Sequence, residues 1–120
     1  MRFMDVALEE ARLAAARGEV PIGAVIVHRG DIVARHGNLT RATNDVTAHA
    51  EIAAIRSAGE KVGSERLCEC DMYVTLEPCA MCAGAISLAR IGKLVFGACD
   101  PKGGAVIHGA RFFEQPTCHW

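Results

Sequence analysis

Apolar residues repeat along the chain with two different periods, and their alternation predicts the order of the secondary-structure elements. Residues 3–17 carry apolar side chains at helical spacing and are followed by Gly18, which is typical of an amphipathic helix. Two β-rich runs follow, at 20–27 and 32–36, and the Arg29-Gly30-Asp31 turn between them predicts an antiparallel hairpin. The remaining predicted elements are a helix at 49–58 ending at Gly59, a strand at 72–76, a helix at 79–89 and a strand at 93–98.

This order of elements predicts the fold class. After the hairpin, helices and strands alternate, and that order favours parallel pairing through crossover helices. The sequence therefore predicts an α/β fold whose mixed sheet opens with an antiparallel N-terminal hairpin and continues with parallel strands. Two segments lack a period: residues 37–47 form a long polar loop, and residues 99–120 offer only a short turn around Phe112-Phe113.

Length and composition restrict the kind of protein. The chain has 120 residues, 51% of them hydrophobic, so it fits a single domain with a core of its own. A formal net charge of −1 and 5% aromatic residues are not the composition of a basic or base-stacking nucleic-acid binder. Without a secretion signal or an apolar run of about 20 residues, we expect a cytoplasmic protein that does not enter the membrane. Its six cysteines are then expected as thiols or metal ligands.

Two short segments carry the candidate chemistry. Residues 47–51 (TAHAE) contain a His-x-Glu pair, and residues 77–82 (EPCAMC) contain a Cys-x-x-Cys pair. Each pair alone is ambiguous, because Cys-x-x-Cys also occurs in redox dithiols and in structural zinc sites. Together they offer one imidazole and two thiolates, from His49, Cys79 and Cys82. Three protein ligands leave the fourth tetrahedral position of a zinc ion open, as in catalytic sites.

Both segments are predicted to begin helices, and this position supports the same chemistry. Backbone N–H groups at a helix start stabilise negative charge and help to keep Cys79 and Cys82 deprotonated. A zinc ion bound in this way lowers the pKa of its water from about 15.7 towards about 7. Glu51, two residues after His49, is predicted to move protons from this water to a ring nitrogen and to the leaving amine. The combined spacing is typical of zinc deaminases.

Over nearly its whole length the sequence resembles the cytidine deaminase superfamily, and within it the bacterial tRNA-acting adenosine deaminases that make inosine at the wobble position. The resemblance is carried by residues 20–25 (VPIGAV), 37–38 (GN), 44–52 (NDVTAHAEI), 73–85 (YVTLEPCAMCAGA) and 95–105 (VFGACDPKGGA). It implies a three-layer α/β/α fold with helices on both faces of a five-stranded mixed sheet. It also implies one zinc ion per chain and a homodimer with its active sites near the interface.

The same resemblance implies a substrate and its contacts. Asn38 would hydrogen-bond a flipped-out base, and the Ala50 backbone would help to hold the base edge beside Glu51. Asp100 and Lys102 would lie where the anticodon loop of a tRNA passes. The implied reaction is hydrolytic deamination of adenosine to inosine, with zinc-bound hydroxide attacking C6 and ammonia released. Taken as residues alone, Asn38 and Asp100 also fit ordinary turn positions.

The resemblance further implies where the family's domain would extend. The family continues past the position of Trp120 with a fifth strand and terminal helices, so residues 1–120 are expected to form one zinc-dependent deaminase domain without that tail. Glu77 is expected to cap the helix start or a nearby backbone group. The four other cysteines are expected as apolar fillers or surface thiols rather than a second metal site: Cys68, Cys70, Cys99 and Cys118.

Two other functions remain open on the residues. The same metal centre serves deaminases of a free base or nucleoside, such as guanine, cytosine or cytidine, and the near-neutral charge favours them. The stretch 100–105 and the match around Asn44 favour tRNA instead. A non-catalytic zinc-stabilised binding module is the third reading, and the retained Glu51 argues against it, because a structural zinc ion needs no proton shuttle.

Overall fold

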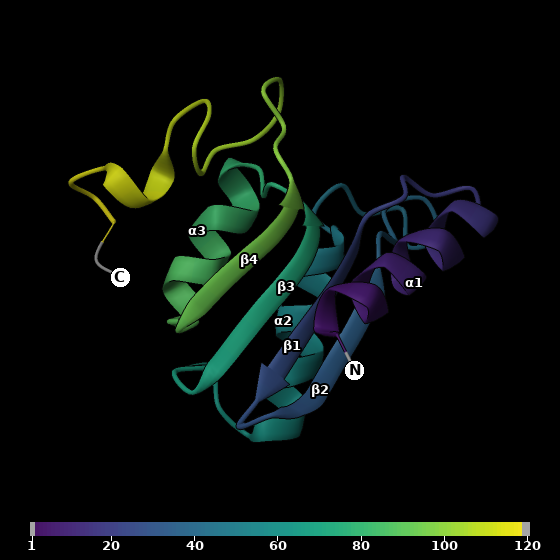
Figure 1. Ribbon diagram of the computed structural model, residues 1–120, viewed down its shortest axis with the longest axis horizontal. Helices are drawn as coiled ribbons and strands as arrows, with labels where there is room; N and C mark the ends of the chain where they lie inside the picture. The colour runs from purple at the N-terminus through teal and green to yellow at the C-terminus, as the bar shows by residue number, and fades with distance from the viewer. Residues whose placement is uncertain (1, 119–120) are drawn as a thin grey trace.

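The chain folds into a four-stranded sheet with helices on both faces, as the computed structural model shows for residues 2–118 (Figure 1). The predicted domain ends, residues 1 and 120, lie outside this described part. In chain order the elements are α1 (Phe3–Ala16), β1 (Gly23–His28), β2 (Asp31–Gly37), α2 (Ala50–Val62), β3 (Cys70–Leu76), α3 (Ala80–Ala89), β4 (Lys93–Ala98) and the short 3-10 helix η1 (Phe112–Glu114).

The sheet is mixed, with the strand order β2-β1-β3-β4. β1 pairs antiparallel with both β2 and β3, whereas β3 and β4 are parallel and are joined by the crossover helix α3. α1 lies on one face, and α2 and α3 lie on the other (Figure 1). The predicted three-layer α/β fold with an antiparallel opening hairpin is therefore confirmed, and within the described strands parallel pairing is limited to β3 and β4.

Alternating residues of the central strands build two separate apolar layers. Ala24 and Ile26 of β1 pack with Met72 of β3 in the cluster that contains the buried alanines of α2. Their neighbours Val25 and Val27 pack on the opposite face against α1. Because successive strand residues point to opposite faces, a strand covered on both sides is apolar along its length, as β1 is from Gly23 to Val27 before it ends at His28.

Two glycines let α1 lie close to the sheet. Gly23 of β1 and Gly37 of β2 are register partners beneath this helix. A Cβ on Gly23 would lie 2.7 Å from Ala11 N, and a Cβ on Gly37 would lie 2.8 Å from Glu10 O. No side chain fits between the helix backbone and either strand, so these positions need glycine.

The second helix is longer than predicted. Gly59 was expected to end it, but α2 continues to Val62 and ends at Gly63, which has a φ of 82° and donates its N–H to Gly59 O. The prediction was wrong because a glycine ends a helix only where the chain adopts the left-handed conformation, and Gly63 adopts it. None of the helices in the described part of the chain has the length and apolar character to span a bilayer.

The order of strands and helices brings several connections to one edge of the sheet. The starts of α2 and α3, the loop before α2, the α1–β1 connection and the segment after β4 all lie at this edge (Figure 1). Residues from segments far apart in the sequence can therefore form one site there.

Candidate metal centre

The three predicted metal ligands lie at the starts of two neighbouring helices. His49 is the residue before the first turn of α2, and Cys79 holds the same position in α3. Both have extended backbones, with ψ angles of 158° and 176°. In each case a candidate ligand is the last extended residue before the helix begins. Cys82 follows in the first turn of α3 and is fully buried. Since α2 and α3 pack on the same face of the sheet, their starts face each other.

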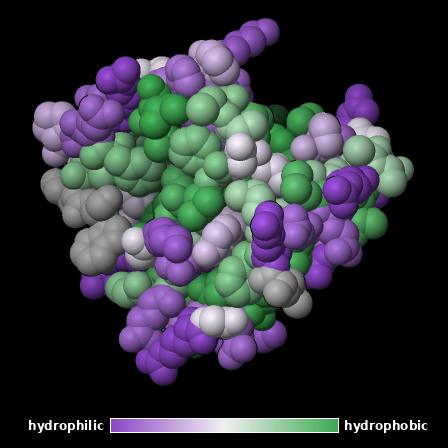
Figure 2. Space-filling view, in the orientation of Figure 1, coloured by the Kyte–Doolittle hydropathy of each residue, from purple (hydrophilic) through white to green (hydrophobic). Residues whose placement is uncertain are grey.

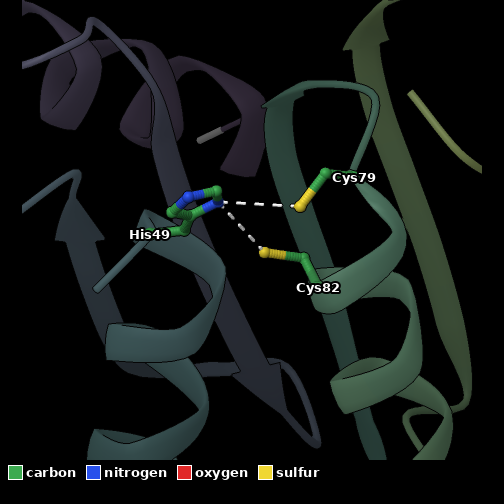
Figure 3. Close-up of side chains that lie close together, drawn as sticks. All are labelled: His49, Cys79 and Cys82. Carbon is green, nitrogen blue, oxygen red and sulfur yellow. Dashed lines mark hydrogen bonds between the residues drawn. The ribbon is translucent and has the colours of Figure 1, made fainter. Parts of the chain in front are cut away.

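The donor atoms of these residues converge (Figure 3). His49 Nδ1 lies 3.7 Å from Cys79 Sγ and 3.5 Å from Cys82 Sγ. In tetrahedral zinc sites, bond lengths of about 2.0 Å to nitrogen and about 2.3 Å to sulfur place such atoms about 3.5 Å apart. Within residues 2–118, no other group of three or more His, Cys, Asp or Glu side chains has its ligand atoms gathered in this way. Cys68 and Cys70 therefore do not belong to a second cluster there.

The pKa values of the two cysteine thiols are shifted in opposite directions. Cys82 donates a hydrogen bond to the Cys79 thiolate, which lowers the pKa of Cys79 to about 5, and the backbone N–H groups of Met81 and Cys82 contribute in the same direction. The pKa of Cys82 is raised far above its usual range by this pairing and by burial. A bound cation would hold both cysteines as thiolates and displace their remaining protons.

Glu51 lies in the first turn of α2 beside these donors, and its side chain is buried. Burial raises its pKa, and the negative charge of the Cys79 thiolate raises it further. Its Oε1 atom is buried and has no hydrogen-bond partner within the described chain. An orphaned carboxylate oxygen next to three converging ligands fits a metal-bound water or a substrate proton. The donor set and this oxygen therefore fit a zinc ion.

Asn38 is buried at the start of the loop that precedes α2. Its backbone N–H donates to Ile22 O, and its Nδ2 donates to Thr40 Oγ1 at 3.1 Å. The next residue, Leu39, donates its N–H to Ala48 O. This bond places the Asn38 segment alongside the chain that leads to His49 and to the buried Ala50, whose role at the base edge, like the base contact of Asn38, stays a prediction.

Asp100 and Lys102 lie in the turn that follows β4. The Asp100 carboxylate accepts the backbone N–H groups of Lys102 and Gly103 at 3.2 and 3.0 Å, so it closes this turn. Lys102 is exposed. The Ala105 N–H donates to Pro78 O, which brings the segment against the entrance to α3. The turn reading of Asp100 is thus observed, and the contacts of both residues with RNA stay predictions.

Glu77 makes more contacts at this edge of the sheet than the sequence predicted. Its side chain is 0% exposed, and it binds a segment far along the chain instead of capping α3. Its carboxylate accepts the backbone N–H groups of Asp100, Val106, Ile107 and His108 and lies 2.8 Å from His108 Nδ1. Burial opposes its ionisation, but the bond with His108 and the backbone N–H groups lower the pKa of Glu77 to about 2.

A second buried carboxylate was missed by the sequence reasoning. Glu19, in the α1–β1 connection, accepts the backbone N–H groups of Arg41 and Ala42 at 3.0 and 2.8 Å. Burial opposes its ionisation, but these two bonds leave its pKa below the usual value. Glu77 could be predicted to act near a helix start because it precedes Pro78 and Cys79 in the sequence. No local pattern marks Glu19, because its partners lie more than 20 residues away.

Comparisons with known proteins agree with this geometry. Residues 1–98 match the family model of the cytidine and deoxycytidylate deaminase zinc-binding region. A tRNA-specific adenosine deaminase of Agrobacterium fabrum (strain C58) is 67% identical over 117 residues, which are 98% of this chain and 77% of that protein. A tRNA-specific adenosine deaminase of Bacillus subtilis (strain 168) is 52% identical over 85% of this chain and 63% of its own length.

Two solved structures separate close from distant similarity. A chain from a study of A-to-I editing by tRNA:A34 deaminases superposes with a TM-score of 0.96 at 67% identity, covering 98% of this chain and 90% of the other. A guanine deaminase from Bacillus subtilis superposes with a TM-score of 0.79 at 41% identity, covering 81% and 62%. With the matching family model over most of its length and the metal ligands gathered at two helix starts, this chain belongs to the cytidine and deoxycytidylate deaminase family.

Proposed function

We propose that this chain hydrolytically deaminates adenosine to inosine at the wobble position of tRNA, with one zinc ion held by His49, Cys79 and Cys82. The observation that carries the chemistry is the buried Glu51 carboxylate, whose Oε1 is unpartnered in the described chain beside the three donors. The substrate is supported by 67% identity over 98% of the chain to a tRNA-specific adenosine deaminase.

The bound zinc ion would supply a Lewis acid and a water of lowered pKa. Glu51 would carry two protons in turn: its carboxylate takes one from that water and delivers it to the ring nitrogen, then takes the second from the hydroxyl group added to the base and delivers it to the leaving amine. Asn38 would hydrogen-bond the base and the Ala50 backbone would hold its edge. Asp100 and Lys102 would lie beside the RNA on the other side of the entrance.

The environment of Glu51 suits a group that both accepts and releases protons. A carboxylate of ordinary pKa is a weak base near neutral pH, because it holds protons poorly. Burial raises the pKa of Glu51 and brings it closer to that range. Burial also keeps bulk water away from the proton being transferred.

The test is an assay of the zinc-loaded chain on two kinds of substrate. An anticodon stem-loop with a wobble adenosine is incubated in parallel with guanine, cytosine and cytidine, and inosine and ammonia are measured. We expect inosine in the RNA and no ammonia from the free compounds. Ammonia from guanine without inosine would instead favour a free-base deaminase, the class of the Bacillus subtilis structure with a TM-score of 0.79.

Two variants separate metal binding from proton transfer. Glu51→Gln keeps the shape of the side chain and removes the base, so we expect turnover to fall by a factor of about 100 or more while zinc stays near one per chain. Cys82→Ala is expected to lose zinc as well as turnover. Undiminished turnover in Glu51→Gln would refute the proton-shuttle role.

We further propose that two copies of the chain associate through the outer side of α3. This helix exposes 82% of Leu88 and 37% of Met81. Figure 2 views the face of the sheet opposite α3 and shows apolar atoms over β4 and the segment that follows it. Large exposed apolar side chains on one helix are typical of an interface. Light scattering is expected to give a dimer for the parent chain and a folded monomer for Leu88→Lys, with a lower melting temperature because association stabilises the native state. A monomeric parent chain would refute this proposal.

We place the protein in the cytoplasm, because tRNA is found there and because the cysteines of the described chain are all free thiols.

A further inference from the structure

We propose that Arg17 and Arg41 form a contact site for the backbone phosphates of the RNA, on the side of the active site where Asn38 lies. The proposal rests on the proposed RNA substrate and names a part of its binding surface. Both residues are exposed. Arg17 belongs to the end of α1, and Arg41 belongs to the loop that begins with Asn38.

The two guanidinium groups are held in place by reciprocal bonds. Arg17 Nη2 donates to Asn38 O at 3.3 Å, from the α1–β1 connection to the loop. Arg41 Nη1 donates to Gly18 O at 3.0 Å, from the loop back to that connection. A guanidinium has five N–H donors in a planar arrangement, so one carbonyl bond leaves four for a ligand. Fixing such a group beforehand reduces the entropy that binding would cost.

The charges of these arginines are not consumed by ion pairs. Arg29 and Arg35 each bind a carboxylate, whereas neither Arg17 nor Arg41 has a carboxylate oxygen within 4.0 Å in the part of the chain that the structure describes. The positive charges of Arg17 and Arg41 both act on the Glu19 carboxylate and help to lower its pKa. Its carboxylate is buried, at 6% exposure, and already accepts two backbone N–H groups. The exposed layer at this corner therefore carries positive charge, with the negative charge beneath it.

The position of this corner matches the place where RNA phosphates must pass. Arg17 contacts the main chain of Asn38 itself, and Leu39 is bonded to Ala48, one residue before the ligand His49. A base received at Asn38 brings the phosphates on either side of its own nucleotide to the rim of that loop. Arginine binds phosphate oxygens through two parallel N–H bonds, which suits it to this contact.

This arrangement also explains how a chain with a net charge of −1 could attract RNA. Phosphate binding depends on the few cations near the backbone and not on the total charge, because each contact releases counterions from the nucleic acid. Single-stranded loops are recognised through such contacts together with base contacts. Two fixed arginines beside the base pocket would therefore supply the electrostatic part of the binding locally.

The experiment measures how the affinity for RNA depends on salt. Zinc-loaded Glu51→Ala protein, which cannot turn the substrate over, is titrated with an anticodon stem-loop at several salt concentrations, and log Kd is plotted against log salt concentration. Each phosphate contact to a single strand contributes about 0.7 to this slope. We expect Arg17→Gln and Arg41→Gln each to reduce the slope by about 0.7, and the double variant by about 1.4.

Matched variants separate phosphate binding from loop support. Arg17→Lys and Arg41→Lys keep the charge and are expected to keep most of the slope. Arg66→Gln removes the same charge from an exposed residue in the α2–β3 connection, and it should leave the slope unchanged. A thermal melt of each variant checks that it is folded.

Two results would overturn the proposal. Weaker binding with an unchanged slope would mean that the arginines only support the loop, and unchanged binding would mean that they do not contact the RNA. Failure of the proposed function has a different signature, since the unsubstituted chain would then make no inosine in the stem-loop.

Discussion

The metal ligands and the residues expected to face the substrate lie at the same edge of the sheet, but different forces hold them there. His49, Cys79 and Cys82 sit at helix starts whose helices are packed on the sheet by a buried apolar cluster. The two flanking segments, 38–47 and 99–108, contribute little to that cluster. They are instead fastened by the buried carboxylates Glu19 and Glu77.

The two flanks also differ from each other. Segment 99–108 makes most of its bonds to the rest of the fold through one carboxylate, because Glu77 binds four of its backbone N–H groups and one of its side chains, and the Ala105 N–H adds a bond to Pro78 O. The loop 38–47 has bonds of its own, such as Leu39 N to Ala48 O and Thr47 N to Asp45, and Glu19 adds only two. The candidate metal ligands are therefore placed by the packed core, whereas the segments expected to contact the substrate are held by separate bonds that mutations can remove one at a time.

Removing the metal is expected to have the largest effect on stability and the smallest on architecture. At a zinc concentration about a thousandfold above Kd, binding stabilises the fold by about 4 kcal/mol, and a chelator should abolish this. The helices should persist, because Ala54, Met72 and their neighbours are buried without help from the metal. Thermal melting and far-UV circular dichroism with and without chelator measure both. Loss of the helical signal at room temperature would show that zinc, not the core, holds the helix starts.

Glu77→Gln is expected to release segment 99–108 while sparing the metal. The amide replaces one of the two carboxylate oxygens with an NH₂ group, so either the Asp100 N–H bound at Oε1 or the three N–H groups of residues 106–108 bound at Oε2 lose their buried acceptor. We expect hydrogen exchange at these amides to rise at least roughly tenfold. Zinc content should remain near that of the parent. Exchange that stays slow would mean that other bonds, such as Ala105 N–H to Pro78 O, hold the segment without Glu77.

Gly104→Ala tests the same fastening from the other side, with a smaller effect. A Cβ at this position would lie 2.6 Å from both Glu77 Oε2 and Asp100 O, so the segment must shift, at a cost of about 1–3 kcal/mol. The control is Gly103→Ala, whose Cβ meets only the end of the Asp100 side chain at 3.0 Å. Chemical denaturation of the two variants gives the difference, and equal stabilities would contradict a close fit at Gly104.

Glu19→Gln is expected to have the smallest effect, and one that depends on pH. The pKa of Glu19 lies below its usual value of 4.5, so its ionised form stabilises the fold above pH 4.5 and this contribution is lost as the pH falls through the lowered pKa. The melting temperatures of parent and variant should therefore differ near about pH 6 and converge as the pH falls below 4.5 and through the lowered pKa of Glu19. Glu60→Gln, which removes an exposed charge from α2, should show no such convergence. A gap that persists into acid would show that the Glu19 carboxyl is not ionised in the fold.

Most of the fold and the metal centre could be predicted because their causes are local. The periods of apolar residues place all three helices and four strands of the described chain, and errors are confined to ends such as Gly59, where the backbone conformation at Gly63 decides. The ligands could be predicted because zinc needs a small set of donor types, and because Cys79 and Cys82 meet within one helical turn. The spacing of His49 and Glu51 places the predicted proton carrier at the same helix start.

Only the tertiary structure decided how the site is framed. β1 pairs antiparallel with β3, a choice that the order of elements does not determine, and this choice brings the α1–β1 connection to the edge where the ligands lie. Glu19, Glu77, Arg17 and Arg41 act on partners more than 20 residues away. From its residue type alone, a charged side chain is predicted to be exposed to solvent. Its burial and its partners follow from how distant segments meet, and therefore could not be read from the residues alone.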